Sequence, residues 1–227
     1  MSEINHVAII LDGNRRYAKK LMLEPWKGHD FGADKVERLL EWCEEFKIKE
    51  LTLYTFSMQN FNRPKEEVDY LMGVVKRMAK KFMQDPRIIE KGVQINIVGR
   101  YSLFPQDVIE VCEQVMDKTK NNSNYILNLA FGYGGREEII DAVKSIVAEH
   151  PSQEEITEEY FANHLYMKSE PDLVIRTGGA MRTSNFLPWQ TIYSEWFFLD
   201  KTWPEMEKVD FKAILDEFQE RERRFGK

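Results

Sequence analysis

The sequence predicts an α/β fold with one open, mostly parallel β-sheet surrounded by helices. Short apolar runs rich in β-branched and aromatic residues alternate with stretches of helical period. This alternation implies parallel strands joined by helical crossovers. The runs are nearly continuous in apolar residues, as in strands that are covered on both faces. No linker-like stretch divides the chain, so residues 1–227 are expected to form a single domain.

Most of the expected strands are followed directly by a polar or glycine-rich segment. They span residues 7–11, 51–56, 93–98, 125–131 and 172–175, with a weaker candidate at 196–199. In residues 31–46 the apolar side chains lie mostly on one helical face, which predicts a helix. Pro64 suits the first turn of a long helix over 65–84. Further helices are predicted over 105–118, 135–149 and 208–224.

Composition excludes several classes of protein. The net charge is -6, and the pI is about 5.4, which argues against a nucleic-acid-binding surface. No signal-like leader and no apolar run long enough to cross a bilayer is present. Cys43 and Cys112 are far apart and are interpreted as buried free thiols, which favours a reducing, cytoplasmic location.

Polar chemistry follows several of the predicted strands. DGNRR, SMQNFNR, GYGGR and RTGGAMRTSN each begin at a strand end. Ligands of open parallel sheets bind beyond the carboxyl ends of the strands, so these segments predict one phosphate-binding rim. The chain has no P-loop, GxGxxG, GxSxG or zinc-ligand spacing, which argues against a nucleotide, hydrolase or zinc site.

The first cluster directly follows a buried strand. Asp12 is interpreted as a Mg²⁺ ligand, because Mg²⁺ takes few protein carboxylates beside substrate phosphates. Gly13 and Asn14 allow the backbone to approach an anion, and Arg15 and Arg16 suit bidentate contact with phosphate. The competing interpretation is that Asp12 serves only as a salt-bridge partner.

Two further clusters predict additional phosphate contacts. Arg176, Arg182 and Ser184 flank a Thr-Gly-Gly turn and resemble a second anion site, unless TGG is only a turn. Asn60 and Arg63 precede the helix at 65, where Ser57 could serve as a cap. His29, near the start of another helix, is either a phosphate donor or a plain surface histidine.

The motifs run in the order HVAIILDGNRRYAKK, GHDFGADKV, LTLYTFSMQNFNRP, LNLAFGYGGREEI, DLVIRTGGAMRTSNFLPWQTIYSE and RERRFG. In this series the chain resembles the cis-prenyltransferases, the undecaprenyl diphosphate synthase family, from His6 to Gly226. The resemblance implies a homodimeric enzyme with a hydrophobic tunnel. It also implies Mg²⁺-dependent condensation of an allylic prenyl diphosphate with isopentenyl diphosphate, and transient membrane contact of a cytoplasmic protein through its lipid product.

The resemblance also assigns residues. Asp12 and Asn60 would be catalytic, with Asp12 and Glu195 as metal ligands and the RERRFG tail reaching the partner subunit. Substrate would be bound by Gly13, Asn14, Arg15, Arg16, Tyr17, His29, Ser57, Gln59, Phe61, Arg63, Arg176, Arg182 and Ser184. The helix at 65–84 would line the tunnel or form ordinary core through Val68, Leu71, Met72, Val75, Met78, Ala79 and Phe82.

Several positions depart from the family pattern. Tyr17 and Phe61 stand where tryptophan is usual, and Gln59 and Ala180 stand where glutamate is usual. The lost charges raise the hypothesis of non-head-to-tail condensation onto an allylic acceptor such as dimethylallyl diphosphate. Two competing hypotheses are a non-catalytic partner subunit of a prenyltransferase and a protein that only binds or dephosphorylates isoprenoid diphosphates.

Overall fold

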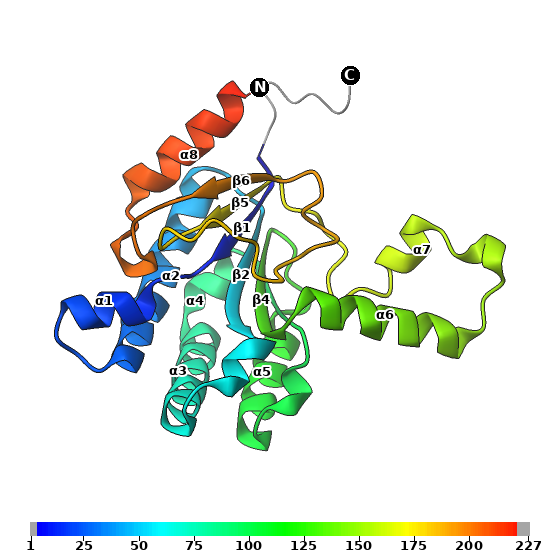
Figure 1. Ribbon diagram of the computed structural model, residues 1–227, viewed down its shortest axis with the longest axis horizontal. Helices are drawn as coiled ribbons and strands as arrows, with labels where there is room; N and C mark the ends of the chain where they lie inside the picture. The colour runs from blue at the N-terminus through cyan, green and yellow to red at the C-terminus, as the bar shows by residue number, and fades with distance from the viewer. Residues whose placement is uncertain (1–3, 222–227) are drawn as a thin grey trace.

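A computed structural model describes residues 4–221 and contains a parallel six-stranded sheet (Figure 1). The strand order is β3-β4-β2-β1-β5-β6, and every neighbouring pair is parallel, which confirms the predicted fold class. The strands are β1 (His6–Ile10), β2 (Glu50–Ser57), β3 (Val93–Val98), β4 (Tyr125–Tyr133), β5 (Leu173–Arg176) and β6 (Glu195–Phe198).

The five predicted helices are present. They are α2 (Gly28–Glu45), α3 (Lys65–Gln84), α5 (Gln106–Thr119), α6 (Gly135–Glu149) and α8 (Lys208–Glu220). The last was expected to reach 224, but α8 ends at Glu220, and residues beyond 221 lie outside the described chain. Three short helices were not predicted, because each is too short to show a period: α1 (Asn14–Lys20), α4 (Pro86–Glu90) and α7 (Glu158–Ala162).

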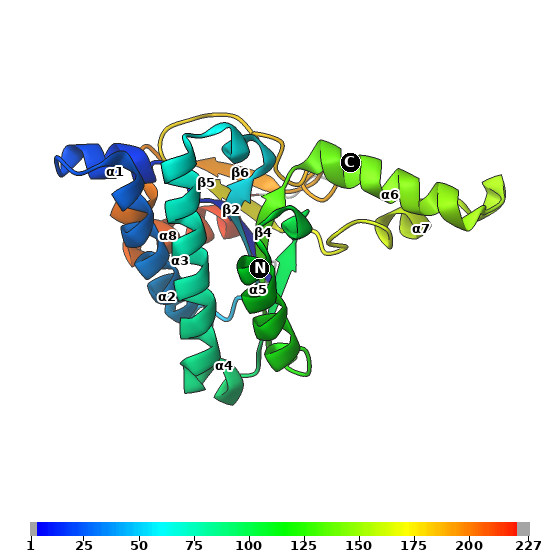
Figure 2. The ribbon, with the colours of Figure 1, turned by 90° about the horizontal axis from the view of Figure 1, so that it is seen from below.

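The two faces of the sheet are covered differently. On one face, alternate residues of β1, β2, β4 and β5 pack against α2 and α8 around Leu39, Trp42 and Phe211. On the other face, segments without regular secondary structure pack on the sheet through Met167, Phe186 and Leu187. α6 and α7 extend away from the body in both views (Figure 2). The sheet is therefore not enclosed by helices alone.

Both cysteines are free and buried, as predicted. Burial raises the pKa of Cys43 to about 12 and that of Cys112 to about 11, so neither thiol is ionised near neutral pH. Among the described residues, no helix combines the length and the apolar character needed to span a membrane.

Candidate active site

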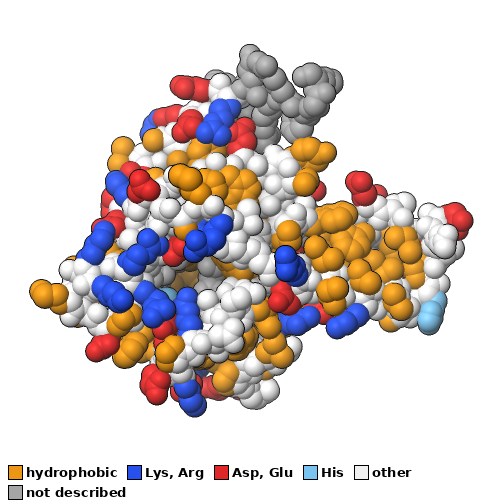
Figure 3. Space-filling view, viewed as in Figure 1, with side chains coloured by type: hydrophobic (Ala, Val, Ile, Leu, Met, Phe, Trp, Pro, Cys, Tyr) orange, Lys and Arg blue, Asp and Glu red, His pale blue; other side chains and the backbone are white. Residues whose placement is uncertain are grey.

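A cavity of about 670 Å³ opens at the carboxyl ends of the central strands. Its mouth is lined by Asp12 after β1, by Ser57 at the end of β2 and by Arg176 at the end of β5. Figure 3 shows the hollow with lysine and arginine side chains on its rim. The predicted convergence of strand ends on one rim is therefore present.

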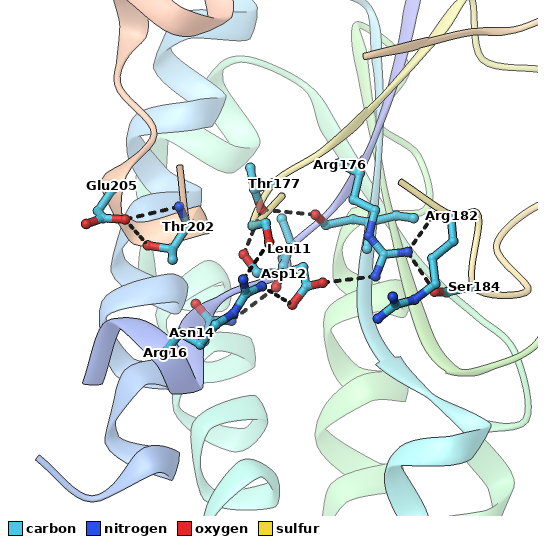
Figure 4. A network of polar contacts seen from close by, with 12 residues as sticks. Leu11, Asp12, Asn14, Arg16, Arg176, Thr177, Arg182, Ser184, Thr202 and Glu205 are labelled. Carbon is cyan, nitrogen blue, oxygen red and sulfur yellow. Dashed lines mark hydrogen bonds and ion pairs between the residues drawn. The ribbon is translucent and has the colours of Figure 1, made fainter. Parts of the chain in front are cut away.

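Asp12 and Arg176 form the centre of the mouth (Figure 4). Arg176 Nη2 donates to Asp12 Oδ2 at 2.9 Å, and Nη1 donates to Ser184 Oγ at 2.6 Å. Arg176 Nη1 also donates to the carbonyl oxygen of Arg182. The Nε atom of Arg176 is buried without a hydrogen-bond partner among the described residues. The second cluster is thus built around one buried guanidinium, which uses three of its five N–H donors in these contacts.

The turn after β1 is fixed by contacts from distant segments. Arg16 Nη2 lies 3.3 Å from Asp12 Oδ1, and Arg16 Nη1 donates to the carbonyl oxygen of Gly178 at 2.6 Å. Gly13 has φ +105°, and a Cβ there would come within 2.6 Å of Thr202 Cβ. Glycine is therefore required at this turn both for its backbone conformation and for the space it leaves.

A buried glutamate, Glu67 on α3, organises the first cluster. Glu67 Oε1 accepts from Arg63 Nη1 at 2.9 Å and lies 3.5 Å from His29 Nε2 and 3.7 Å from Arg15 Nε. One inaccessible carboxylate thus holds together three basic side chains, from α1, from α2 and from the segment that precedes α3. Sequence reasoning did not identify Glu67.

His29 lies inside the first turn of α2 and lines the cavity. Burial, reinforced by the nearby charge of Arg63, lowers the pKa of His29 to about 4, although Glu67 acts in the opposite direction. The imidazole is therefore neutral at physiological pH. A neutral ring can donate one hydrogen bond to a phosphate oxygen without adding charge.

The segment after β2 forms a short 3-10 helix over Met58–Asn62. Ser57 was expected to cap the helix at 65, but it instead caps this 3-10 helix in a reciprocal capping box, in which the Ser57 N–H donates to Asn60 Oδ1 at 3.0 Å; the N-cap position of α3 is Pro64. Ser57, Asn60 and the exposed Gln59 line the mouth. Phe61 instead packs edge-on against Phe56, away from the cavity lining.

The depth of the cavity is apolar. Leu71, Val75, Met78, Ala79 and Phe82 of the predicted α3 stripe line it, together with residues of β3, β4 and α5. Val68 and Met72 do not line it and pack in the core beside the cavity. The stripe therefore serves partly as cavity wall and partly as ordinary core.

The predicted site residues other than Glu195 fall into three groups. The mouth is lined by Asp12, Asn14, His29, Ser57, Gln59, Asn60, Arg63, Arg176, Arg182 and Ser184. Gly13, Arg15 and Arg16 stand directly behind this lining through the contacts described above. Tyr17 packs edge-on against Phe31 and, like Phe61, lies off the lining.

The structure does not bring Glu195 to Asp12 within one chain. Glu195 is level with Leu173 at the start of β5, whereas Arg176, which holds Asp12, lies three residues along the strand, roughly 10 Å away. Glu195 accepts instead from Arg221 Nη1 at 2.9 Å. The remainder of the RERRFG tail, 222–226, lies outside the described residues.

Metal ligation in this site would rest on few protein groups. Within residues 4–221, no cluster of three or more histidine, cysteine, aspartate or glutamate side chains is arranged to hold a metal ion.

Comparisons with known proteins agree with this geometry. Residues 10–226 match the family described as "Putative undecaprenyl diphosphate synthase". The chain is 50% identical to the tritrans,polycis-undecaprenyl-diphosphate synthase (geranylgeranyl-diphosphate specific) of Pyrococcus horikoshii, over 98% of this chain and 86% of that protein. It is 45% identical to the isoprenyl transferase of Thermus thermophilus, over 98% and 88% of the two chains.

Solved structures extend the comparison. Lavandulyl diphosphate synthase from Lavandula x intermedia, in complex with dimethylallyl diphosphate, superposes with a TM-score of 0.92 at 32% identity and covers 99% of both chains. A probable undecaprenyl diphosphate synthase from Campylobacter jejuni gives a TM-score of 0.85 at 33% identity over 100% of both chains.

Proposed function

We propose that this chain, which belongs to the undecaprenyl diphosphate synthase family of cis-prenyltransferases, lengthens an allylic prenyl diphosphate by condensing it with isopentenyl diphosphate. The observation that carries the proposal is one cavity with charged groups of both signs at its mouth and an apolar interior. Such a cavity suits substrates with a diphosphate head and a hydrocarbon chain.

The donor diphosphate would bind at the Glu67-centred cluster. Cleavage of the allylic C1–O bond builds negative charge on the departing diphosphate, and Arg15, Arg16 and Arg63 stabilise that charge. Neutral His29 donates a hydrogen bond to the same group. The isopentenyl diphosphate head would bind at Arg176, Arg182 and Ser184, which line the mouth together.

The new carbon–carbon bond joins donor C1 to the terminal alkene carbon of isopentenyl diphosphate. The other alkene carbon becomes cationic, and a proton then leaves the CH2 group between it and the carbon that bears the diphosphate. The carboxamide of Asn60 is too weak a base to take that proton. Because its oxygen is engaged by the Ser57 N–H, Asn60 offers amide N–H donors to the cavity. Asn60 therefore orients the departing diphosphate, whose oxygen accepts the proton.

Mg²⁺ would be held by Asp12 together with diphosphate oxygens and would neutralise charge on the leaving group. The residues fit this role, because the carboxylate of Asp12 faces the cavity mouth between Arg16 and Arg176. The proposed part of Glu195 as a second ligand rests on family resemblance.

The apolar depth accounts for chain growth. Each isoprene unit buries five carbons, worth about 4 kcal/mol at roughly 0.8 kcal/mol per carbon. Leu71, Val75 and Met78 would contact the growing chain. We take geranylgeranyl diphosphate as the first donor to test, since the Pyrococcus horikoshii relative is named as specific for it.

A second candidate is condensation onto dimethylallyl diphosphate. The observation favouring it is the TM-score of 0.92 with lavandulyl diphosphate synthase bound to that compound. The test pairs purified protein and Mg²⁺ with a labelled allylic donor series and either isopentenyl or dimethylallyl diphosphate. Elongation by isopentenyl diphosphate is expected. Products from dimethylallyl diphosphate instead would favour the second candidate, and no carbon–carbon bond formation with either would overturn both.

The homodimer expected from resemblance has a candidate surface on α6. Ile140, Val143 and Val147 are exposed on this projecting helix at spacings that place them on one face. Figure 3 shows apolar side chains gathered over this arm. Such a face is typical of an interface, so we expect Val143→Asp to shift the protein from dimer to monomer in sedimentation velocity.

A further inference from the structure

We propose that the tip of the hairpin formed by α1 and the 3-10 helix Pro25–Lys27 binds the surface of a lipid bilayer that carries anionic head groups. This tip, Leu21–Leu23, is named here the apolar tip. Leu21, Met22 and Leu23 are 43%, 94% and 41% exposed. Three consecutive large apolar side chains in contact with water are unusual on a protein whose core is well packed.

The tip stands in a basic setting. Residues 15–27 carry five cations, Arg15, Arg16, Lys19, Lys20 and Lys27, and one acid, Glu24, in a chain of net charge -6. Lys19 and Lys27 form no ion pair with any described residue, whereas Lys20 pairs with Glu205. Figure 3 shows basic side chains gathered over the part of the molecule that carries α1. Apolar residues bordered by lysines match the interface of an anionic membrane.

The hairpin begins and ends at the cavity. Asn14, its first residue, and His29, two residues beyond its last, both line the mouth. Its base is tightly closed, because a Cβ on Gly28 would lie 1.9 Å from the carbonyl oxygen of Asn14. The seven residues of α1 span about 10 Å, so a bilayer at the tip would lie close to the mouth. Figures 1 and 2 both show the hairpin projecting from the body.

A membrane suits this tip better than a protein partner. A stable protein interface buries about 800 Å² on each side, which three side chains cannot supply. A bilayer needs only shallow insertion of a few apolar side chains together with nearby cations. The inference rests in part on the proposed function, because a polyprenyl product must pass from the cavity into a lipid phase.

The test is flotation of the full chain, without substrate, on vesicles of phosphatidylcholine alone or mixed with phosphatidylglycerol. We expect binding to the mixed vesicles, about tenfold weaker or more for Met22→Asp and tighter for Met22→Trp. Lys19→Gln combined with Lys27→Gln should weaken binding on the order of tenfold. The matched controls are Ile89→Asp on α4 and the pair Lys47→Gln and Lys49→Gln just before β2, and they should bind like the parent chain.

Binding is measured without turnover, so the result stands apart from the proposed reaction. Turnover of a short donor without vesicles should be the same for Met22→Asp and the parent chain, since Met22 lies outside the cavity lining. Failure of the parent chain to float, or unchanged flotation of Met22→Asp, would overturn the proposal. A changed oligomeric state in Met22→Asp with intact flotation would assign the tip to protein contact instead.

Discussion

The two charged clusters at the cavity mouth are built with opposite signs. Around β5 the buried ion is a cation, since the side chain of Arg176 is 4% exposed and its partner Asp12 is 29% exposed. Around α3 the buried ion is an acid, since the side chain of Glu67 is 2% exposed, and its more accessible partners are Arg15, Arg63 and His29. In each cluster, a ligand that enters the mouth contacts the more exposed member of the ion pair rather than the buried one. Under the proposed function, the Arg176 cluster would therefore present a carboxylate to Mg²⁺ beside its diphosphate, whereas the Glu67 cluster would present mainly cations to the other diphosphate.

The largest expected effect comes from removing the accessible charge of the Asp12–Arg176 cluster. Asp12→Asn keeps the shape of the side chain and its acceptor oxygen but removes the charge between Arg16 and Arg176. We expect kcat/KM to fall by about 10²–10³-fold, in the range typical of groups that stabilise transition-state charge. The measurement is steady-state turnover at saturating Mg²⁺.

The control for this substitution is Asp107→Asn, which removes an exposed carboxylate on α5 paired with Lys76. It should retain full activity. If Asp12→Asn kept activity within tenfold of the parent chain, the carboxylate would be only a salt-bridge partner, and the contrast between the clusters would lose its functional meaning.

Removing the buried acid of the Glu67 cluster should instead act first on stability. Glu67→Gln leaves the partly buried Arg63 without the carboxylate that it pairs with, and loss of one member of a buried pair costs about 3–5 kcal/mol. We expect the free energy of unfolding to fall by about 3 kcal/mol, because the neutral amide still accepts one hydrogen bond. The measurement is chemical denaturation with and without pyrophosphate.

Pyrophosphate makes this prediction specific to the cluster. An anion among Arg15, Arg63 and His29 replaces the missing charge, so it should restore more stability in Glu67→Gln than it adds to the parent chain. Glu66→Gln, one residue away on the exposed side of the same turn, is the control. Equal stabilisation of both chains by pyrophosphate would contradict a diphosphate site at this cluster.

The neutral histidine of the same cluster gives a dependence on pH. The pKa of His29 is about 4 in the fold and about 6.5 when exposed, so the unfolded chain binds more protons between these values. Stability therefore rises with pH across this window and is lost as pH falls. From pH 7 to 5 the His29 contribution to that loss is about 2 kcal/mol.

His29→Gln should lose less stability than the parent chain over the same pH range. Buried His6 also has a lowered pKa and keeps part of the slope in both proteins, so only the difference reports His29. Identical slopes for His29→Gln and the parent chain would show that His29 is not held neutral.

The contrast between the clusters also shows what sequence could and could not predict. Asp12 and Arg176 end apolar runs, so a parallel sheet must place them at one edge. Glu67 is one of two acids in the first turn of α3, where acids are common for electrostatic reasons alone. Only the packing of α3 beside α2 buries it beneath basic side chains. Glu195 shows the reverse case, because its motif is clear while strand register places it at the far edge.

The smallest expected effect concerns the acids that this chain lacks. Gln59 and Ala180 stand at or near the mouth, and Gln59 forms no side-chain hydrogen bond with the described residues. If their loss has loosened the choice of acceptor, Gln59→Glu with Ala180→Glu should raise the ratio of isopentenyl to dimethylallyl products several-fold, which corresponds to about 1 kcal/mol. Gln153→Glu, which adds an acid on the distant arm, is the control. Competition between the two acceptors in one reaction measures the ratio directly. An unchanged ratio would mean that the Arg176 cluster alone selects the acceptor. The substitutions at positions 59 and 180 would then have no effect on which acceptor is used.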